Sequence, residues 1–88
     1  MDNLPNSAAF VASSGMRLRL LLHLTTGPKS PSQLAEIERK HISHVSRALA
    51  EMRGYGLVDY WESDSRERYY RVTIHGYAVY SAIARLAK

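Results

Sequence analysis

The chain has 88 residues, no cysteine and a formal net charge of +4. This length suits one small core, so we expect residues 1–88 to form a single domain in which residues 1–12 either fray or contribute to an interface. No apolar run approaches the ~20 residues that span a bilayer, and the missing cysteines exclude disulfides and thiol nucleophiles. We therefore expect a cytoplasmic protein, whose charge is compatible with a polyanion partner but does not identify one.

A first helix is expected to begin at Ser13 or Ser14, because either side chain can cap it. A turn around residues 8–11 precedes or joins this helix. Leucines then recur at helical spacing and form a broad apolar stripe: Leu18, Leu20, Leu21, Leu22 and Leu24. The helix should end within residues 25–28, since glycine accepts a left-handed cap and proline cannot continue a helix.

The second helix has the clearest start in the sequence. Ser30 can accept a hydrogen bond from the amide of Gln33, whose side chain can reach back to the amide of Ser30. Pro31 occupies the first helical position, where its missing N–H costs nothing. The expected core side of this helix consists of Leu34, Ala35 and Ile37. Residues 38–41 are too polar to be buried, and we expect them to form a turn.

A third helix is predicted over residues 42–53. Four apolar residues fall on one of its faces: Val45, Ala48, Leu49 and Met52. The opposite face carries Ser43, Arg47 and Ala50, flanked by His44 and Ser46. Because Arg47 is the one long cation among small residues, this face can approach the edges of DNA bases closely. Gly54 and Gly56 end the helix.

A β-hairpin and a last helix complete the chain. Residues 57–62 and 68–72 are rich in valine and aromatic residues, which favours strands. The polar residues 63–67 form the loop between them. Thr73 can then cap a final helix over residues 74–86.

In this order, the elements resemble the prokaryotic winged helix-turn-helix regulators of the MarR/ArsR-like type, especially their compact archaeal single-domain forms. The motifs that carry the resemblance are Gly27-Pro28, Ser30-Pro31-Ser32, Leu34-Ala35, His44-Val45-Ser46-Arg47-Ala48-Leu49, Gly56-Leu57-Val58 and Arg68-x-Tyr70-x-x-Thr73-x-x-Gly76. The resemblance covers about residues 14–86. It implies a mainly α fold of the α+β class, with a three-helix core, a two-stranded wing and a C-terminal helix. The family's turn is usually apolar and contains glycine, whereas here residues 38–41 are polar.

The resemblance implies a transcriptional regulator that binds double-stranded DNA without a cofactor. Residues 42–53 would enter the major groove as the recognition helix, and the wing at residues 63–68 would contact phosphate or the minor groove. The expected DNA contacts are Ser32, Lys40, Ser43, His44, Ser46, Arg47, Arg66 and Arg68. Alternatively, the two wing arginines pair with Asp64 and Glu67.

The last helix is apolar over a wider arc than one core contact uses. At 100° per residue, its apolar residues occupy two adjoining sides: Val79, Ala82, Ile83 and Leu86, then Tyr77, Tyr80, Ala84 and Ala87. A monomer would leave one of these strips in water, so we expect a homodimer. The residues expected at its interface are Phe10, Tyr77, Tyr80 and Ile83. A small-molecule effector, if one exists, would bind at this interface.

Two other functions are open at this stage. A winged helix can dock on a protein instead of DNA, but such an adaptor should carry apolar residues on the outer face of its third helix. In a metal-responsive repressor, His41 and His44 would share a metal with His75 or with a partner's residues. We expect no metal, because no ordered cluster supports one, and we expect His23 to be a near-core histidine rather than a ligand. No residue pattern indicates an enzyme.

Overall fold

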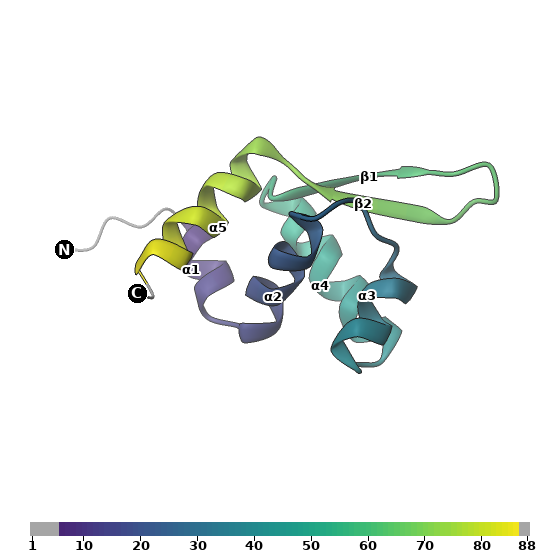
Figure 1. The fold of residues 1–88 in the computed structure, drawn as a ribbon, viewed down its shortest axis with the longest axis horizontal. Coiled ribbons are helices and arrows are strands. Elements are labelled where there is room, and N and C mark those ends of the chain that lie inside the picture. The colour runs from purple at the N-terminus through teal and green to yellow at the C-terminus, as the bar shows by residue number, and fades with distance from the viewer. Residues whose placement is uncertain (1–5, 87–88) are drawn as a thin grey trace.

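The computed structural model describes residues 6–86, over which the chain forms five helices and two strands (Figure 1). These are α1 (Asn6–Ala12), α2 (Gly15–Leu24), α3 (Pro31–Glu38), α4 (Ile42–Gly54), β1 (Val58–Glu62), β2 (Arg68–Val72) and α5 (Ile74–Leu86). Helices α2, α3 and α4 pack together, the β-hairpin projects from them along the longest axis, and α5 runs back to α1 at the opposite end. This arrangement confirms the expected winged helix-turn-helix fold. No helix within the described range is long and apolar enough to cross a membrane.

The N-terminal part has the expected helix start at Ser14, and the turn expected around residues 8–11 is a separate helix, α1. It ends at Ala12, and Ser14 then caps α2 by accepting a hydrogen bond from the amide of Arg17 at 3.3 Å. Ala8 and Val11 bury the inner side of α1, which contacts both α2 and α5. Residues 1–5 and Ala87, which entered the expectations about the terminus and the interface, lie outside the described residues.

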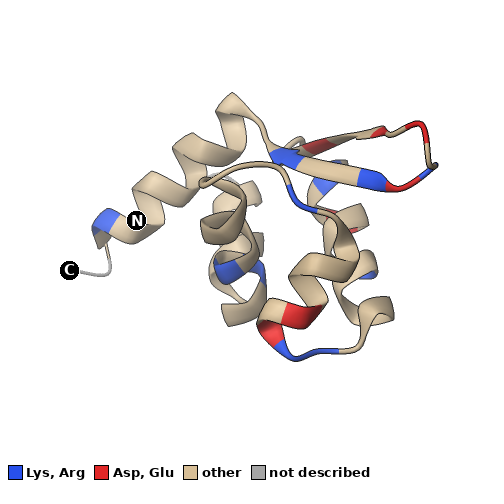
Figure 2. Cartoon of the chain, turned by 45° about the vertical axis from the view of Figure 1, so that its right-hand side comes forward, with Lys and Arg blue, Asp and Glu red and all other residues tan. Residues whose placement is uncertain are grey.

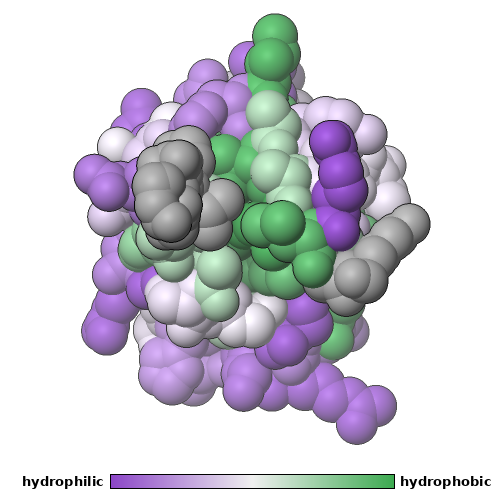
Figure 3. Space-filling view, turned by 90° about the vertical axis from the view of Figure 1, so that its left-hand side faces the viewer, coloured by the Kyte–Doolittle hydropathy of each residue, from purple (hydrophilic) through white to green (hydrophobic). Residues whose placement is uncertain are grey.

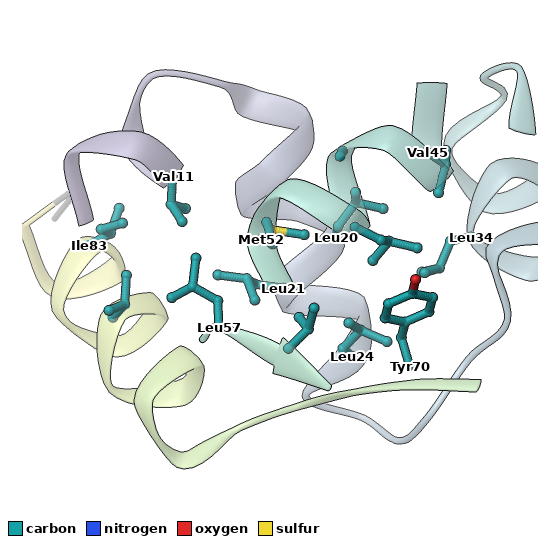
Figure 4. Packing of buried hydrophobic residues seen from close by; sticks show 14 of the residues in the cluster. Val11, Leu20, Leu21, Leu24, Leu34, Val45, Met52, Leu57, Tyr70 and Ile83 are labelled. Carbon is teal, nitrogen blue, oxygen red and sulfur yellow. The ribbon is translucent and has the colours of Figure 1, made fainter. Parts of the chain in front are cut away.

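The hydrophobic core runs without interruption from α1 and α5 to the base of the wing (Figure 4). It includes the four apolar residues expected on the inner face of α4, all of which are buried. Two expectations were wrong, because Leu22 is 43% exposed and Ile37 is 48% exposed. In α2 and α3 the buried face is narrower than the arc of apolar residues. Leu22 and Ile37 lie at the edge of that arc. The buried residues of α2 are Leu20, Leu21 and Leu24.

The turn between α3 and α4 takes three residues, 39–41, because Glu38 belongs to α3. Arg39 adopts the left-handed conformation, with φ 55° and ψ 44°, at the position where glycine is the commoner residue. The amide of Lys40 donates back to the carbonyl of Ala35 at 3.0 Å and so ends α3. His41 then caps α4, since its Nδ1 accepts a hydrogen bond from the amide of Ser43 at 3.2 Å. Arg39 therefore takes the left-handed position of this turn, because residues 38–41 contain no glycine.

The wing is an antiparallel hairpin whose register runs from Val58↔Val72 to Glu62↔Arg68. The amide of Ser63 donates to the carbonyl of Glu67 at 2.8 Å and closes the expected loop. A contact that the sequence did not predict joins the wing to the helices: Lys29 exchanges two backbone hydrogen bonds with Tyr70, of 3.0 and 2.8 Å. These bonds fix the base of the wing against the segment that follows α2.

Thr73 and Gly76 join the wing to α5. Thr73 caps the helix as expected, since its Oγ1 accepts from the amide of Gly76 at 2.9 Å and donates to the carbonyl of Gly56 at 2.6 Å. Gly76 is buried against Leu57, just before β1, and Val72 of β2, and a Cβ atom at this position would overlap the carbonyl oxygen of Leu57. The base of the wing and the first turn of α5 therefore approach each other more closely than a side chain allows.

Candidate nucleic-acid interface

The outer face of α4 is exposed along its whole length. Its members are Ser43, His44, Ser46, Arg47 and Ala50. Among residues 6–86, Arg47 takes part in no ion pair, so its guanidinium is free to meet a ligand. Ser43 is partly engaged, because its Oγ lies 2.9 Å from Nδ1 of the capping His41. The result is a surface of short side chains with one long cation at its centre.

A polar cluster holds the end of α3 just before the turn to α4. We expected Glu38 to be too polar for burial, but its side chain is only 6% exposed. Its carboxylate accepts a hydrogen bond from Nε of Arg19 at 2.8 Å and lies 2.8 Å from Nε2 of His23. Burial raises the pKa of Glu38, but the hydrogen bonds from His23 and Arg19 outweigh it and leave the pKa below its ordinary value. Two partners thus offset the cost of burying this charge, and His23 is the near-core histidine that we expected.

Ser32 lies inside α3 and Lys40 lies just after it, and both are exposed. Ser32 is in the first turn of α3, next to the capping box that the structure confirms. There, the amide of Gln33 donates to Oγ of Ser30 at 3.1 Å, and the Gln33 side chain accepts from the amide of Ser30 at 2.9 Å. Lys40 lies in the turn before α4. Both side chains are therefore accessible to a phosphate group at the surface of α3 and α4.

The wing carries charges of both signs (Figure 2). Arg66 and Arg68 are exposed, and neither forms the ion pair with Asp64 or Glu67 that was the alternative reading, as judged over residues 6–86. Glu67 instead accepts a hydrogen bond from the hydroxyl of Tyr69 at 3.1 Å, which raises the pKa of Tyr69. Because acidic and basic residues alternate at the tip, any contact with DNA there would depend on individual arginines rather than on a basic patch.

One basic residue near this surface was missing from the sequence-based set. Arg53 lies in the last turn of α4, with its guanidinium carbon 4.8 Å from the ring centre of Tyr60 in β1. Its Nε lies 3.9 Å from Oδ1 of Asp59. Arg53 follows Ala50 by three residues, and this helical spacing predicts that Arg53 lies at the edge of the outer face. Nothing in the sequence reveals its contact with the wing.

The histidines of the metal-responsive alternative do not meet. The rings of His41 and His44 lie 6.2 Å apart at the start of α4. His75 lies in α5, where its Nε2 is 3.0 Å from Oγ of Ser7 in α1. In the described part of the chain, no three histidine or acidic side chains come close enough to hold a metal ion.

The residues expected at a subunit interface fall into two environments. Ile83 is 8% exposed and packs in the core of its own chain, and the ring of Phe10 stacks on Tyr55 at 4.2 Å. Tyr80 is partly buried, whereas Tyr77 is 56% exposed and the neighbouring Ile74 is 92% exposed. Figure 3 shows apolar side chains gathered on the end of the molecule formed by α1 and α5. Tyr77 and Ile74 are therefore the exposed apolar residues of α5 near its start.

No protein-family model and no curated protein matches the chain, but solved structures do. A possible transcriptional regulator for arsenical resistance is 30% identical, over 92% of this chain and 83% of that one, with a TM-score of 0.76. A MarR-family transcriptional regulator from Silicibacter pomeroyi is 24% identical, over 90% and 60%, with a TM-score of 0.76. A homodimeric winged helix-turn-helix DNA-binding domain from Mycobacterium bovis, a possible ArsR-family regulator, is 17% identical, over 99% and 90%, with a TM-score of 0.81.

The three structures differ in what they establish. At 24% and 17% identity, the second and third show the fold alone. The first is 30% identical and is covered over 83% of its length. This similarity indicates a common family as well as a common fold. The chain is shorter than many of these regulators and spans about half of some, such as 51% of ZitR from Lactococcus lactis.

Proposed function

Because this chain belongs to the winged helix-turn-helix transcriptional regulators of the ArsR/MarR type, we propose that it binds double-stranded DNA as a homodimer and regulates transcription. The outer face of α4 carries this proposal, since it presents short exposed side chains around an unpaired Arg47. An adaptor that docks on a protein would carry apolar residues there. The work of such a regulator would place the protein in the cytoplasm, on the nucleoid.

In the proposed complex, α4 lies in the major groove with its outer face toward the bases. Arg47 is long enough to bond N7 and O6 of a guanine with both arms of its guanidinium. Ser43, His44 and Ser46 are short enough to let the helix approach, and each can donate or accept a hydrogen bond at a base edge. Sequence preference would then depend mainly on Arg47.

Phosphate contacts would hold α4 in register. Ser32 is exposed in the first turn of α3, and Lys40 is exposed in the turn that follows this helix. The wing, residues 63–68, would place Arg66 and Arg68 on a phosphate or in the minor groove. These contacts supply affinity that is independent of sequence and sensitive to salt.

The proposal is tested by a salt titration of binding to duplex DNA of random sequence. Each phosphate neutralised by a lysine or arginine makes the slope of log affinity against log salt steeper by about 0.9. With Lys40, Arg66, Arg68 and their symmetry mates in contact, we expect a steep loss of affinity between low and physiological salt. Binding that is absent, or that does not change with salt, would favour the adaptor.

Replacing Arg66 and Arg68 together with alanine should weaken binding to specific and random DNA alike. Both side chains lie at the wing and have no ion-pair partner within residues 6–86, so their loss removes charge rather than base readout. The salt slope should become shallower by up to about two units per chain. A variant in which Asp64 and Glu67 are both replaced by the corresponding amides serves as the control and should bind more tightly. If the arginine variant kept the wild-type slope, the wing would not touch phosphate.

A homodimer would use the outer side of α5. Tyr77 and Ile74 are too exposed to contribute to the core of their own chain, and large exposed apolar groups mark interaction sites. A twofold contact would also present two copies of α4 to successive turns of DNA.

An arsenical is a poor candidate effector, because trivalent arsenic prefers soft thiolates and this chain has no cysteine.

Tyr77→Glu should convert the dimer into a monomer without unfolding the chain. Its ring is 56% exposed, so a charged replacement does not enter the core. Ile83→Glu is unsuitable as a probe, because Ile83 lies in the core and the change would unfold the chain. Sedimentation at micromolar concentration should give twice the chain mass of 10.0 kDa for the wild type and for the matched control Ser46→Glu. A wild-type chain that sediments as a monomer would contradict the interface.

A further inference from the structure

Two arginines from different elements meet at one aromatic ring where α4 passes the wing. The guanidinium carbons of Arg53 and Arg68 lie 4.8 and 4.4 Å from the ring centre of Tyr60. Arg53 comes from the last turn of α4 and Arg68 from the start of β2. The π-electrons of the ring attract each cation, and this attraction offsets the repulsion between the two arginines.

Tyr60 is a firm platform for these side chains. It is partly buried and packs against the core, and its ring centre lies 5.2 Å from that of the buried Tyr70 directly across the hairpin. Tyr70 is itself fixed by its two backbone hydrogen bonds to Lys29. The position of the two guanidinium groups is therefore set by the core.

The arginine pair lies at the end of the proposed DNA-reading surface. Ser46, Ala50 and Arg53 follow one another at spacings of four and three along α4, on the side that leads from Arg47 toward the wing. Ser46 and Ala50 are exposed and short. A DNA strand whose bases meet Arg47 would have to continue past these residues to reach the wing, and its backbone would come to Arg53 and Arg68.

Both guanidinium groups keep hydrogen-bonding capacity for an anion. Stacking on an aromatic ring engages a guanidinium through its face and leaves the N–H groups in its plane available for hydrogen bonds. Arg68 uses part of this capacity in a hydrogen bond with the side chain of Tyr70, which raises the pKa of Arg68. Arg68 has no ion pair among residues 6–86, and Arg53 has only Asp59, at 3.9 Å with both side chains half-exposed. Such a long, solvated pair is weak, so a phosphate can displace the carboxylate.

We propose that Arg53 and Arg68, held in place by the ring of Tyr60, clamp backbone phosphates of the DNA strand that runs between α4 and the wing. Tyr60 is a positioning residue, and Asp59 weakens the clamp by competing for Arg53. This proposal rests on the proposed DNA binding and adds three residues to it that the sequence did not indicate: Arg53, Asp59 and Tyr60.

The clamp is tested with the full chain by measuring affinity for specific and random duplex DNA across a range of salt. Arg53→Ala should weaken binding to both several-fold at low salt and make the slope shallower by about one unit per chain. Tyr60→Phe keeps the ring and should match the wild type, whereas Tyr60→Leu should bind like Arg53→Ala. Asp59→Asn should bind more tightly than the wild type, which a purely structural role for Arg53 does not predict.

The outcomes separate the clamp from DNA binding itself. If the wild type binds DNA and Arg53→Ala retains its affinity and slope, the clamp is wrong and the proposed function stands. If Tyr60→Leu behaves like Tyr60→Phe, the ring is not the platform. Thermal unfolding of each variant identifies any loss of fold, and Arg53→Ala decides the question if Tyr60→Leu proves unstable, because Arg53 is exposed. A wild type that binds no DNA at any salt overturns both the function and the clamp.

Discussion

Replacing Arg47 with alanine should weaken binding to the preferred DNA sequence by about 1–3 kcal/mol and remove the preference at one base pair. Arg47 lies at the middle of the exposed face of α4 and makes no ion pair within residues 6–86. The change therefore removes the proposed DNA contact and no ion pair of the chain itself, and alanine favours the helix. Affinities for the preferred sequence and its single-base variants measure the effect, with the thermal midpoint as the check on folding.

Arg47→Lys separates base readout from charge. Lysine keeps the positive charge but cannot present two parallel N–H groups to a guanine. This variant should bind random DNA like the wild type and still lose most of the preference at the same base pair. Arg47 would be removed from the reading surface if the folded alanine variant kept both the affinity and the sequence preference of the wild type.

Gly76→Ala should destabilise the fold by about 1–3 kcal/mol, the usual cost of forcing an extra group into a packed site. The new Cβ would overlap the carbonyl oxygen of Leu57 and lie 2.9 Å from Cγ2 of Val72. The same carbonyl accepts a hydrogen bond from the amide of Thr73 at 3.0 Å, and it lies 3.1 Å from the Thr73 hydroxyl, whose proton it shares with the carbonyl of Gly56. To make room, α5 must move from the wing and weaken this cap. For a domain of this size, we expect the thermal midpoint to fall by at least about 4 °C.

Gly54→Ala is the matched control for the substitution of Gly76. Gly54 ends α4, and a Cβ built there meets nothing within 4 Å. Alanine should therefore leave stability unchanged or raise it slightly through its better helix propensity. Equal thermal midpoints for the two variants would show that the close approach of α5 to the base of the wing does not exclude a side chain at position 76.

Much of the fold could be predicted because its signals are local. The capping box of Ser30 and Gln33, the cap at Thr73 and the five-residue wing loop each depend on groups a few residues apart, and the structure contains all three. The inner face of α4 was equally readable, since its apolar residues recur with the helical period. The separate helix α1 was harder to foresee, because its inward face depends on packing against α5.

The remaining features depend on contacts between distant segments. Glu38 looks like a surface residue until α2 brings Arg19 and His23 to it. Ile37 looks like a core residue, yet it is 48% exposed. In the same way, the meeting of Arg53 with Tyr60 requires α4 and the wing to be in place. In each of these cases tertiary packing determines the environment of the side chain, and the helical period of the sequence does not reveal that packing.

The candidate site could be predicted as a set of positions rather than as a set of contacts. All eight residues expected to touch DNA are exposed, which agrees with such a role without establishing it. Their chemistry follows from residue type, since arginine suits guanine and phosphate. Which of them meet bases and which meet phosphates depends on how two copies of the chain sit on DNA. That arrangement remains a prediction.

Selection of bound sequences from a randomised duplex library tests the central claim, that a dimer reads DNA with α4, most directly. A twofold dimer with α4 in the major groove predicts two inverted half-sites whose centres are about 10 base pairs apart, or a multiple of that distance. Each half-site should contain a guanine whose enrichment disappears with Arg47→Ala. A bound pool without sequence enrichment, or with a single unpaired half-site, would contradict this account.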